Sequence, residues 1–449
     1  MKKSLQTKLI LTLALSAIVW SCQEVESPNM ELSTQDLVNY SSKIIEGEYI
    51  VRLQPTSLNF RKGNDYKANQ AAMRKYSQGL LAQYKIAASN VRLTYSAAID
   101  GFSVHLEPAQ YEAIKNDPRI VSIEPDEIIA LGKPDSPGKG GGGGGNTNKG
   151  PKNKDPEPTP EPTPEPTPDP TPDPEPDPNP GTDYEPEISD PNQEVPWGIN
   201  RVGGFSTYRG TNVAFVIDTG IDLDHPDLNV NASLGFKAVP NDVSTTLDDE
   251  HSHGTHVAGT IAAINNTFGL VGVAAGAQVV PIKVLGPTGS GQKSWVIAGI
   301  DYVAAVGQPG DVANLSLGGS ASSTQDQAVL NAAAKGIYFA IAAGNSAADA
   351  NNYSPARVNG TNIFTISSMD SNGALSSFSN FGNPPIDYAA PGRGIKSTIP
   401  GGGYGFKSGT SMATPHVAGI LLLNGLRADG FVTSDKDSTP DPIAFRADR

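Results

Sequence analysis

The chain has 449 residues, enough for two or three domains, and a net charge of −14 at neutral pH. Thirteen acidic residues and no Lys or Arg lie between Asp155 and Glu194, so the rest of the chain carries only −1 and shows no basic patch of the kind that binds nucleic acid. The single cysteine excludes an internal disulfide.

The first predicted element is a secretory signal over residues 1–21. Residues 1–3 form a short positive start, and the apolar run at 9–20 is too short to span a bilayer. Cys22 follows this run as in bacterial lipoprotein signals, in which the cysteine is lipidated, although Trp20 stands where that pattern has a small residue. The alternative is an ordinary secretory signal with an incidental cysteine. Residues 22–43 are polar and predict a tether, and no other stretch is long and apolar enough to cross a membrane.

Residues 44–130 predict a small α+β domain. Alternating apolar and polar residues predict strands at 48–53, 91–95, 102–106 and 120–124. Helical spacing predicts a helix at 65–86, with Ala72, Tyr76, Leu80 and Tyr84 on one face, and a second helix at 108–115. The order strand, helix, strand, strand, helix, strand is the ferredoxin-like layout.

The composition of residues 131–194 indicates a spacer between the two folded domains. Residues 138–145 are nearly all glycine, and proline occupies every second position over 156–180. Such a proline run forms neither a helix nor a central strand, and as polyproline II it reaches about 75 Å. Nothing in it indicates a recognition motif.

Residues 195–449 predict an α/β domain, a parallel sheet with helices on both faces. Apolar runs predict strands at 213–217, 279–284, 312–317, 337–342 and 363–366, and helical patterns occupy 253–264, 294–306, 324–334 and 415–426. In such sheets the ligand site lies beyond the carboxyl ends of the strands. The chain after Leu426 is short and its residues 435–441 are polar and turn-rich, so the core around the last helix is either incomplete or completed by other parts.

Four polar residues stand where this fold would place a site. Asp218 ends the first strand, His253 opens a helix, Asn345 follows a strand, and Ser411 lies at a helix start. Histidine can take the proton of a serine hydroxyl, a buried carboxylate can orient the histidine, and an amide can donate to an oxyanion. Each residue also has an ordinary structural alternative as a helix cap or turn residue.

A zinc site is the competing interpretation of the histidine-rich segment around His253. His251, His253 and His256 crowd one stretch, but no Glu lies between His253 and His256 and no Cys ligand accompanies them. We therefore do not expect zinc.

The motifs together closely resemble the subtilisin-like serine proteases, nearest to their proteinase K branch. The resemblance covers residues 195–426, and its order Asp, His, Ser differs from that of the α/β-hydrolases. It implies that Ser411 is the nucleophile, His253 the general base and then acid, Asp218 its orienting partner, and Asn345 with the Ser411 N–H the oxyanion hole. The motifs that carry it are Ile217-Asp218-Thr219-Gly220, His253-Gly254-Thr255-His256-Val257-Ala258-Gly259-Thr260, Ala343-Gly344-Asn345 and Gly409-Thr410-Ser411-Met412-Ala413-Thr414-Pro415-His416.

The resemblance also implies substrate-binding segments. Two glycine-rich edges sandwich an extended peptide, and small apolar walls form the primary specificity pocket, so we expect broad cleavage after large apolar residues. Lys293 stands where many relatives carry a tyrosine that closes a more distant pocket. The implied edges are Gly289, Ser290 and Gly291 and then Ser316, Leu317, Gly318 and Gly319, and the pocket wall is Ala342, Ala343 and Gly344.

No cofactor is expected for the chemistry, but the resemblance implies a structural calcium. Asp387, with the carbonyl groups of Thr361 and Ile363, matches the positions of one calcium site of the proteinase K branch. The alternative is an ordinary surface aspartate, because one carboxylate supplies few of the six or more oxygens that calcium takes.

The small N-terminal domain resembles the inhibitory propeptide of these proteases. The motifs that carry this resemblance are Tyr49-Ile50-Val51, Gly101-Phe102 and Ile123-Glu124-Pro125-Asp126. Its alternative is an unrelated binding domain. The chain is thus predicted to be a secreted, autoprocessed, monomeric serine endopeptidase acting on proteins or peptides, without a nucleic-acid partner. The competing functions are a catalytically silent surface binding protein and an esterase with the same triad.

A further hypothesis follows from the domain order. The predicted lipid anchor lies on the propeptide side of the spacer, so cleavage between about Ile129 and Val195 would release the protease from the membrane.

Overall fold

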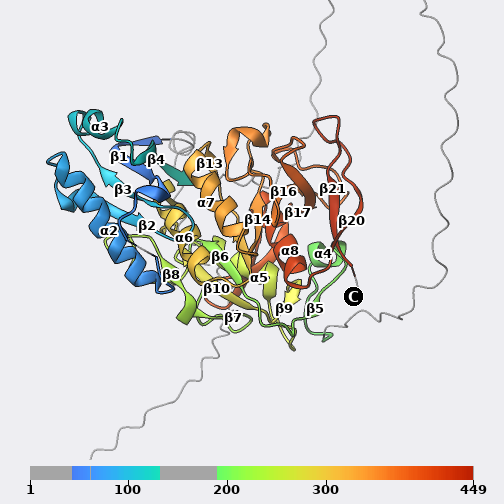
Figure 1. Ribbon diagram of the computed structural model, residues 1–449. Helices are drawn as coiled ribbons and strands as arrows, with labels where there is room; N and C mark the ends of the chain where they lie inside the picture. The colour runs from blue at the N-terminus through green and yellow to red at the C-terminus, as the bar shows by residue number, and fades with distance from the viewer. Residues whose placement is uncertain (1–42, 61, 132–189, 448–449) are drawn as a thin grey trace, which may run out of the picture.

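The computed structural model describes residues 43–60, 62–131 and 190–447. The predicted signal, the lipidation of Cys22, nearly all of the tether and most of the spacer lie outside these residues. No helix in the described ranges is both long and apolar enough to cross a membrane. Two parts are described below as the N-terminal unit, residues 43–131, and the C-terminal unit, residues 190–447. The N-terminal unit lies at one side of the molecule, against α6 and α7, and the last strands lie at the opposite side (Figure 1).

The N-terminal unit has the predicted ferredoxin-like order of elements. Asp65 caps its first helix by accepting a hydrogen bond from the Ala68 N–H, which satisfies one of the free amides of the first turn. The elements are β1 (Lys43–Leu53), α2 (Tyr66–Gln83), β2 (Val91–Tyr95), β3 (Gly101–His105), α3 (Pro108–Ile114) and β4 (Ile120–Ala130), with short 3-10 turns at Pro55–Ser57 and Ala88–Asn90.

The predicted apolar face of α2 is correct in part: Leu80 is buried and Tyr76 and Tyr84 pack against the core, but the centre of the buried stripe is displaced by about one residue. The fully buried positions are Met73, Ser77, Leu80 and Leu81, whereas Ala72 and Tyr76 are only half-buried. Tyr76 lies at the border of the buried stripe, where its hydroxyl reaches the carbonyl oxygen of Ser57 at 2.9 Å. Amphipathic tyrosines suit such borders because one end is apolar and the other is wet.

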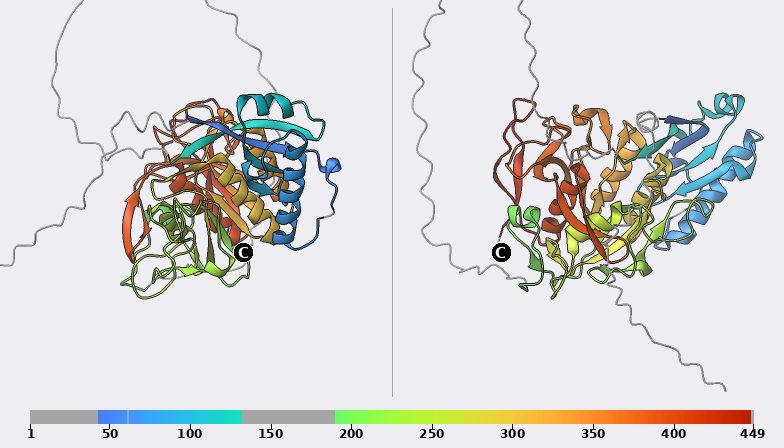
Figure 2. Two further views of the ribbon diagram at one scale, coloured as in Figure 1. Left: turned by 90° about the vertical axis from the view of Figure 1, so that its left-hand side faces the viewer. Right: turned by 180° about the vertical axis from the view of Figure 1, so that it is seen from behind.

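The sheet of the N-terminal unit is buried on both faces. Its order is β11-β4-β1-β3-β2, so its first strand, β11 (Ser290–Gln292), comes from the C-terminal unit. Val51 and Phe102 face the core formed with α2, and Ile50 and Ile129 belong to the core shared with the C-terminal unit. Alternate side chains of a strand point to opposite faces, so β1 contributes to both cores. Two further views agree that the N-terminal unit keeps to one side (Figure 2).

The C-terminal unit is the predicted α/β fold. Its larger strands and helices are β6 (Ala214–Asp218), α5 (His253–Ala262), β10 (Gln278–Lys283), α6 (Lys293–Val306), β12 (Val312–Leu315), α7 (Ser323–Ala333), β14 (Tyr338–Ala342), β16 (Ile363–Met369), β17 (Ile386–Pro391), α8 (Thr410–Leu422), β20 (Leu426–Phe431) and β21 (Pro442–Arg446). The unit also contains α4 (Trp197–Arg201), β5 (Ser206–Thr207), β7 (Asn229–Val230), β8 (Phe236–Lys237), β9 (Ala274–Ala275), β13 (Gly319–Ser320), β15 (Tyr353–Ser354), β18 (Ile395–Ile399) and β19 (Gly403–Lys407).

Ten strands form its central sheet, in the order β20-β21-β17-β16-β14-β12-β6-β10-β7, with β8 also beside β10. The strands from β17 to β10 are mutually parallel. On β6, Phe215 and Ile217 face the core with α6 and α7, while Ala214 and Val216 face the core with α5 and α8. Both faces are therefore covered, and the continuous apolar sequence of β6 follows from this.

The chain after Leu426 completes the sheet. β21 pairs in parallel with β17 and antiparallel with β20, and its Ile443 and Ala444 are buried. The expectation of an incomplete core is thus resolved by residues of the tail itself. The strand β20 escaped prediction because Arg427, Asp429 and Gly430 break its apolar pattern, as an exposed edge strand permits.

Candidate active site

Asp218 and His253 form a buried carboxylate–imidazole pair. Asp218 ends β6 and His253 opens α5, so the sheet and the helix fix the two groups separately. Nδ1 of His253 lies 2.8 and 2.9 Å from the two carboxylate oxygens of Asp218. The helix approaches the strand end closely because residue 254 is glycine: a Cβ there would lie 2.0 Å from the carbonyl oxygen of Gly220.

Asp249 holds the loop that precedes His253. Its carboxylate accepts hydrogen bonds from the Thr219 hydroxyl, from the N–H groups of His251 and Ser252, and from both the N–H and the hydroxyl of Thr255, at 2.7–2.9 Å. Burial would raise the pKa of Asp249, but these hydrogen bonds together keep it below its usual value. Asp249 therefore ties the strand end to the start of α5.

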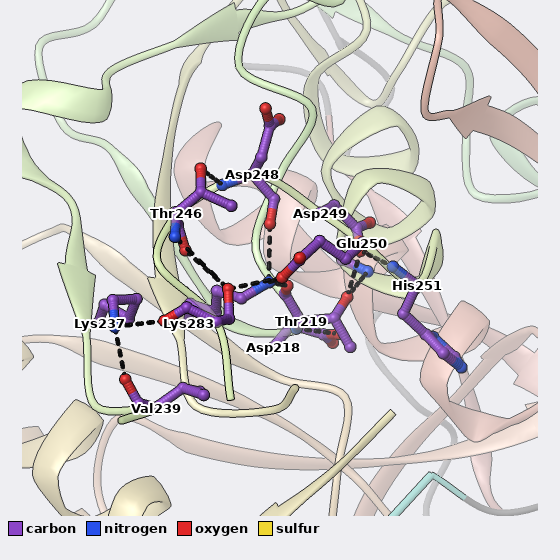
Figure 3. Close-up of polar contacts among 12 residues, drawn as sticks. Asp218, Thr219, Lys237, Val239, Thr246, Asp248, Asp249, Glu250, His251 and Lys283 are labelled. Atoms are coloured by element: carbon purple, nitrogen blue, oxygen red, sulfur yellow. Dashed lines mark hydrogen bonds and ion pairs between the residues drawn. The ribbon is translucent and has the colours of Figure 1, made fainter. Parts of the chain in front are cut away.

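Lys283, on the neighbouring strand β10, holds the turn that follows Asp218. It pairs with Asp218 in the β10–β6 register and is fully buried. Its ammonium group donates to the carbonyl oxygens of Thr219, at 2.5 Å, and Asp248, at 2.7 Å, and lies 3.3 Å from the Glu250 carboxylate (Figure 3). These bonds satisfy a buried cation and fix the turn after Asp218.

Ser411 lies in the first turn of α8, as predicted, and is nearly buried. Its hydroxyl donates to the carbonyl oxygen of Ser316 at 3.0 Å, and the Ser316 hydroxyl donates to the carbonyl oxygen of Ser411 at 2.8 Å. Within residues 43–60, 62–131 and 190–447, no hydrogen bond joins Ser411 to His253. The structure thus pairs Ser411 with the predicted substrate edge, and catalytic hydrogen bonds often tighten only when substrate binds.

Asn345 is oriented by Thr410. Its amide oxygen accepts hydrogen bonds from the N–H of Thr410, at 2.8 Å, and from the Thr410 hydroxyl, at 2.9 Å. The amide nitrogen is then left for another acceptor. A Cβ at position 409 would lie 3.3 Å from this nitrogen, so Gly409 leaves room beside it.

A pocket beside Ser411 collects most of the predicted substrate contacts. All of the predicted residues at 316–319 and 342–345 line it, together with Thr410 and Ser411. The predicted residues at 289–291 lie instead along β4: Ser290 pairs with Ala130, Gly291 pairs with Ile129, and the Leu131 N–H donates to the Gly289 carbonyl oxygen at 3.1 Å. Ile128, Ile129, Ala130 and Leu131 of the N-terminal unit also line the pocket.

Pairing with both β1 and β11 explains why β4 is longer than predicted. Within the N-terminal unit, β1 pairs with β4 as far as Ile128, and β4 continues to Ala130 because β11 pairs with residues 128–130. The strand occupies the cleft as an extended peptide would.

The neighbouring histidines serve the fold. Nε2 of His256 lies 3.0 Å from the Ile395 carbonyl oxygen, and burial lowers the pKa of this histidine to about 3. Burial also lowers the pKa of His251. Among the described residues, no group of three or more His, Cys, Asp or Glu side chains is placed to hold a metal ion.

Asp387 fits one carboxylate ligand of a calcium site. Its carboxylate accepts one hydrogen bond, from the Thr365 N–H at 2.8 Å, and burial raises its pKa to about 6. No Lys, Arg or His of the described residues forms an ion pair with it. A half-buried carboxylate without a counter-charge suits a cation. Ile363 is buried and Thr361 is exposed.

The sequence analysis did not predict the acidic residues that lie next to the site and hold its neighbouring segments by hydrogen bonds. Asp249 has a local signal, since it lies in Asp248-Asp249-Glu250, just before the histidine segment. Asp301 also has one, because it is a charge within the apolar pattern of α6. The Asp301 carboxylate accepts hydrogen bonds of 2.7–3.1 Å from the N–H groups of Ser96, Ala97 and Ala98 of the N-terminal unit.

Two carboxylates of β4 bind the starts of the helices beneath it. The Glu124 carboxylate accepts a hydrogen bond of 3.0 Å from the N–H of Thr324, at the start of α7. The Asp126 carboxylate accepts a hydrogen bond of 3.0 Å from the N–H of Ser294, at the start of α6. Carboxylates are favourable there because the first N–H groups of a helix have no partner within it.

Comparison with known proteins matches two families. Residues 209–427 match the Subtilase family, and residues 48–131 match the Peptidase inhibitor I9 family. Over 240 residues, 51% of this chain, the sequence is 45% identical to subtilisin E of Bacillus subtilis (strain 168), covering 61% of it, and to subtilisin of Bacillus pumilus, covering 84% of it. It is 38% identical over 345 residues, 74% of this chain, to alkaline serine exoprotease A of Vibrio alginolyticus, covering 53% of that protein. The chain thus spans about three fifths of the length of the Bacillus subtilis subtilisins that it matches.

Proposed function

Since the chain belongs to the subtilase family, we propose that it is a serine endopeptidase, made as a proenzyme that the N-terminal unit inhibits. The observation that carries this proposal is the buried Asp218–His253 pair at the strand ends of a sheet whose nearby cleft holds Ser411, Asn345 and the extended strand β4. The motif order Asp, His, Ser supports it. We further propose the division into a propeptide at 44–130, a spacer at 131–194 and a catalytic domain at 195–449.

The reaction is acyl transfer through Ser411. The carboxylate of Asp218 holds the proton on Nδ1 of His253, which leaves Nε2 free to accept one. The Ser411 hydroxyl rotates from the Ser316 carbonyl oxygen to Nε2, gives up its proton and attacks the scissile carbonyl carbon. His253 then returns the proton to the departing amine, and water hydrolyses the acyl-enzyme by the same steps.

Asn345 stabilises the oxyanion of the tetrahedral intermediate. Because Thr410 holds the amide oxygen, the amide nitrogen can donate to the oxyanion without reorganising during the reaction. The Ser411 N–H, at the start of α8, is the second donor.

The primary pocket favours large apolar side chains in this proposal. Ala342 and Ala343 are small and apolar, and Gly344 adds no side chain, so the wall leaves space next to Ser411. We propose broad cleavage after aromatic or aliphatic residues. Nearness to the proteinase K branch rests on the motifs alone, because the relatives named above do not single out that branch.

Labelling with a serine-directed fluorophosphonate tests the activity. We expect the mature protein to be labelled at Ser411 and the Ser411→Ala variant to be unlabelled, with the modified peptide identified by mass spectrometry. Absence of labelling in the mature wild type would favour a catalytically silent binding protein. Hydrolysis of ester substrates without hydrolysis of casein would favour an esterase.

Export and release are proposed from residues 1–22 and the order of the units. Lipidation of Cys22 would anchor the proenzyme, and cleavage beyond β4 would free the C-terminal unit from the membrane. Cell fractionation of wild type and Ser411→Ala tests this: only the variant should stay fully membrane-bound. Equal retention of both proteins would overturn the idea.

A calcium ion at Asp387, with carbonyl groups of Thr361 and Ile363, is proposed as structural. The cation would supply the counter-charge that this half-buried carboxylate lacks. Calorimetric titration of the Ser411→Ala protein with calcium should show a site that Asp387→Asn weakens. Equal heats for the two proteins would exclude Asp387 as a ligand.

A further inference from the structure

Lys293 carries a buried positive charge at the edge of the cleft. It is the first residue of α6 and is 2% exposed. Its ammonium nitrogen lies 3.3 Å from a carboxylate oxygen of Glu127 and 3.1 Å from the hydroxyl of Ser320. The Ser320 hydroxyl donates to the same carboxylate oxygen. One anionic group is thus held by a lysine and a serine of the C-terminal unit.

The anion belongs to the part of the molecule that leaves the cleft when the enzyme matures. Glu127 lies on β4, as does Asp126, whose charge also acts on Lys293. Among the described residues, Glu127 is the only carboxylate within ion-pair distance of Lys293. Departure of β4 therefore leaves Lys293 without a fixed counter-charge, next to a groove built for extended peptides.

The register of β4 places this charge relative to a substrate. Ile129 pairs with Gly291 and is buried in a core that contains Trp295 and Leu317. A Cβ on Gly319 would lie 3.2 Å from Ile129, so this glycine makes room for the side chain. Alternate residues of a strand share one face, so Glu127 and Ile129 lie on the same side of β4. A peptide in this register presents to Lys293 the side chain two residues before the one in the Ile129 position.

We propose that Lys293 and Ser320 form a subsite for an acidic side chain of the substrate, two residues before the residue that takes the place of Ile129. The proposal rests on the proposed protease function and deepens it, since it names proteins with a carboxylate at this position as preferred substrates. A charged carboxylate that accepts a hydrogen bond from Ser320 and pairs with the buried ammonium group of Lys293 gives a stronger interaction than an exposed ion pair.

Competition by synthetic peptides tests the subsite in the mature enzyme. Three peptides carry residues 122–137 of the chain, with Glu127 retained, replaced by Gln, or replaced by Lys. Each competes with a short tetrapeptide substrate that ends before the Lys293 position, so the inhibition constant reports binding whether or not the peptide is cut. We expect the Glu peptide to bind about tenfold more tightly than the Gln peptide, and the Lys peptide to bind most weakly.

Variants of the enzyme locate the effect. Lys293→Gln should remove the preference for Glu over Gln, and Lys293→Glu should reverse it in favour of the Lys peptide. Ser320→Ala should reduce the preference by about twofold to threefold. Lys396→Gln removes an equal charge from a residue paired with Glu194, and it should leave the preference unchanged. The preference in wild type should also shrink as salt is added.

The outcomes separate the two proposals. Failure of the wild type to cleave the short substrate would defeat the protease function. Cleavage of the short substrate with equal inhibition by all three peptides would overturn the acidic subsite and leave the protease function standing. A preference that persists in Lys293→Gln would also overturn the assignment to Lys293.

Discussion

Two regions of the contact between the units hold the N-terminal unit in different ways. The cleft region comprises β4 residues 127–131 with β11 and the segment 316–320, and its bonds are mostly main-chain pairs and apolar contacts. The α6 region comprises Asp301 with Ser96, Ala97 and Ala98. There one buried carboxylate accepts three main-chain N–H groups, and Tyr66 and Gln70 add hydrogen bonds at 3.2 and 3.0 Å.

Under the proposed function, this difference separates catalysis from inhibition. Any extended peptide can reproduce the main-chain bonds of the cleft region, so substrates compete with β4 there. The turn at residues 96–98 has no equivalent in an extended peptide, so the α6 region recognises only the N-terminal unit. Changes in the cleft region should therefore alter the reaction, and changes in the α6 region should alter maturation alone.

The largest expected effect is that of Ser411→Ala in the cleft region. Removing the proposed nucleophile should lower kcat by about 10⁶-fold, the magnitude known from subtilisin itself, a member of this family. The variant should also remain uncleaved, so that the two units stay joined in one polypeptide chain. Electrophoresis of the purified protein would show this. Normal separation of the units in this variant would mean that another protease performs the cleavage.

Asn345→Ala tests the oxyanion donor within the same region. We expect kcat to fall by about 10²–10³, which is the magnitude known for the corresponding asparagine of subtilisin. KM should change little, because the bond forms mainly in the transition state. Steady-state kinetics on a peptide substrate measures both constants, and a loss confined to KM would contradict the assigned role.

Asp301→Asn tests the α6 region. Replacing the carboxylate weakens three buried N–H bonds, and charge-assisted bonds of this kind are worth about 1.5–3 kcal/mol. In full-length Ser411→Ala protein, hydrogen exchange at the amides of Ser96, Ala97 and Ala98 should therefore accelerate by about 10- to 100-fold.

Two controls accompany this variant. Glu112→Gln, at an exposed residue of α3, should leave exchange at these amides unchanged. The mature Asp301→Asn enzyme should keep its kcat/KM, and a large loss would show that the two regions are not separable.

The last effect is expected outside both regions, at Asp441 before β21. Burial raises its pKa to about 6 from the usual 3.8, with Ser367 donating to the carboxylate. The folded state therefore binds more protons than the unfolded state between about pH 4 and 6. The free energy of unfolding should fall as pH rises through this window, by at most about 3 kcal/mol.

Asp441→Asn should flatten this slope. Denaturant unfolding of the Ser411→Ala protein and of the double variant, at pH 4.5 and 7.5, measures the difference. Both proteins should keep the same exchange at residues 96–98. An unchanged slope in the variant would assign the pH dependence to other groups.

The order of most of the longer elements could be predicted because each of these has a local signal, whereas β17, β20 and β21 were not predicted. The apolar run of β6, the helical spacing of α6 and the polar residues at their ends all lie within short stretches of sequence. The predictions were less accurate where the signal came from a neighbour. The strand β4 extends to Ala130 because β11 pairs with it, and the α2 face turned by one residue because its position depends on the sheet beneath.

The sequence by itself determined the family motifs, the two folded units and the residues Asp218, His253, Asn345 and Ser411 as the candidate chemistry. Only the tertiary structure decided which distant groups meet: Asp301 with residues 96–98, Lys293 with Glu127, and β21 with β17. The physical reason is that periodicity and capping act over a few residues, whereas a buried charge is satisfied by whichever group the fold brings within about 3 Å. Such a partner leaves no mark in the local sequence.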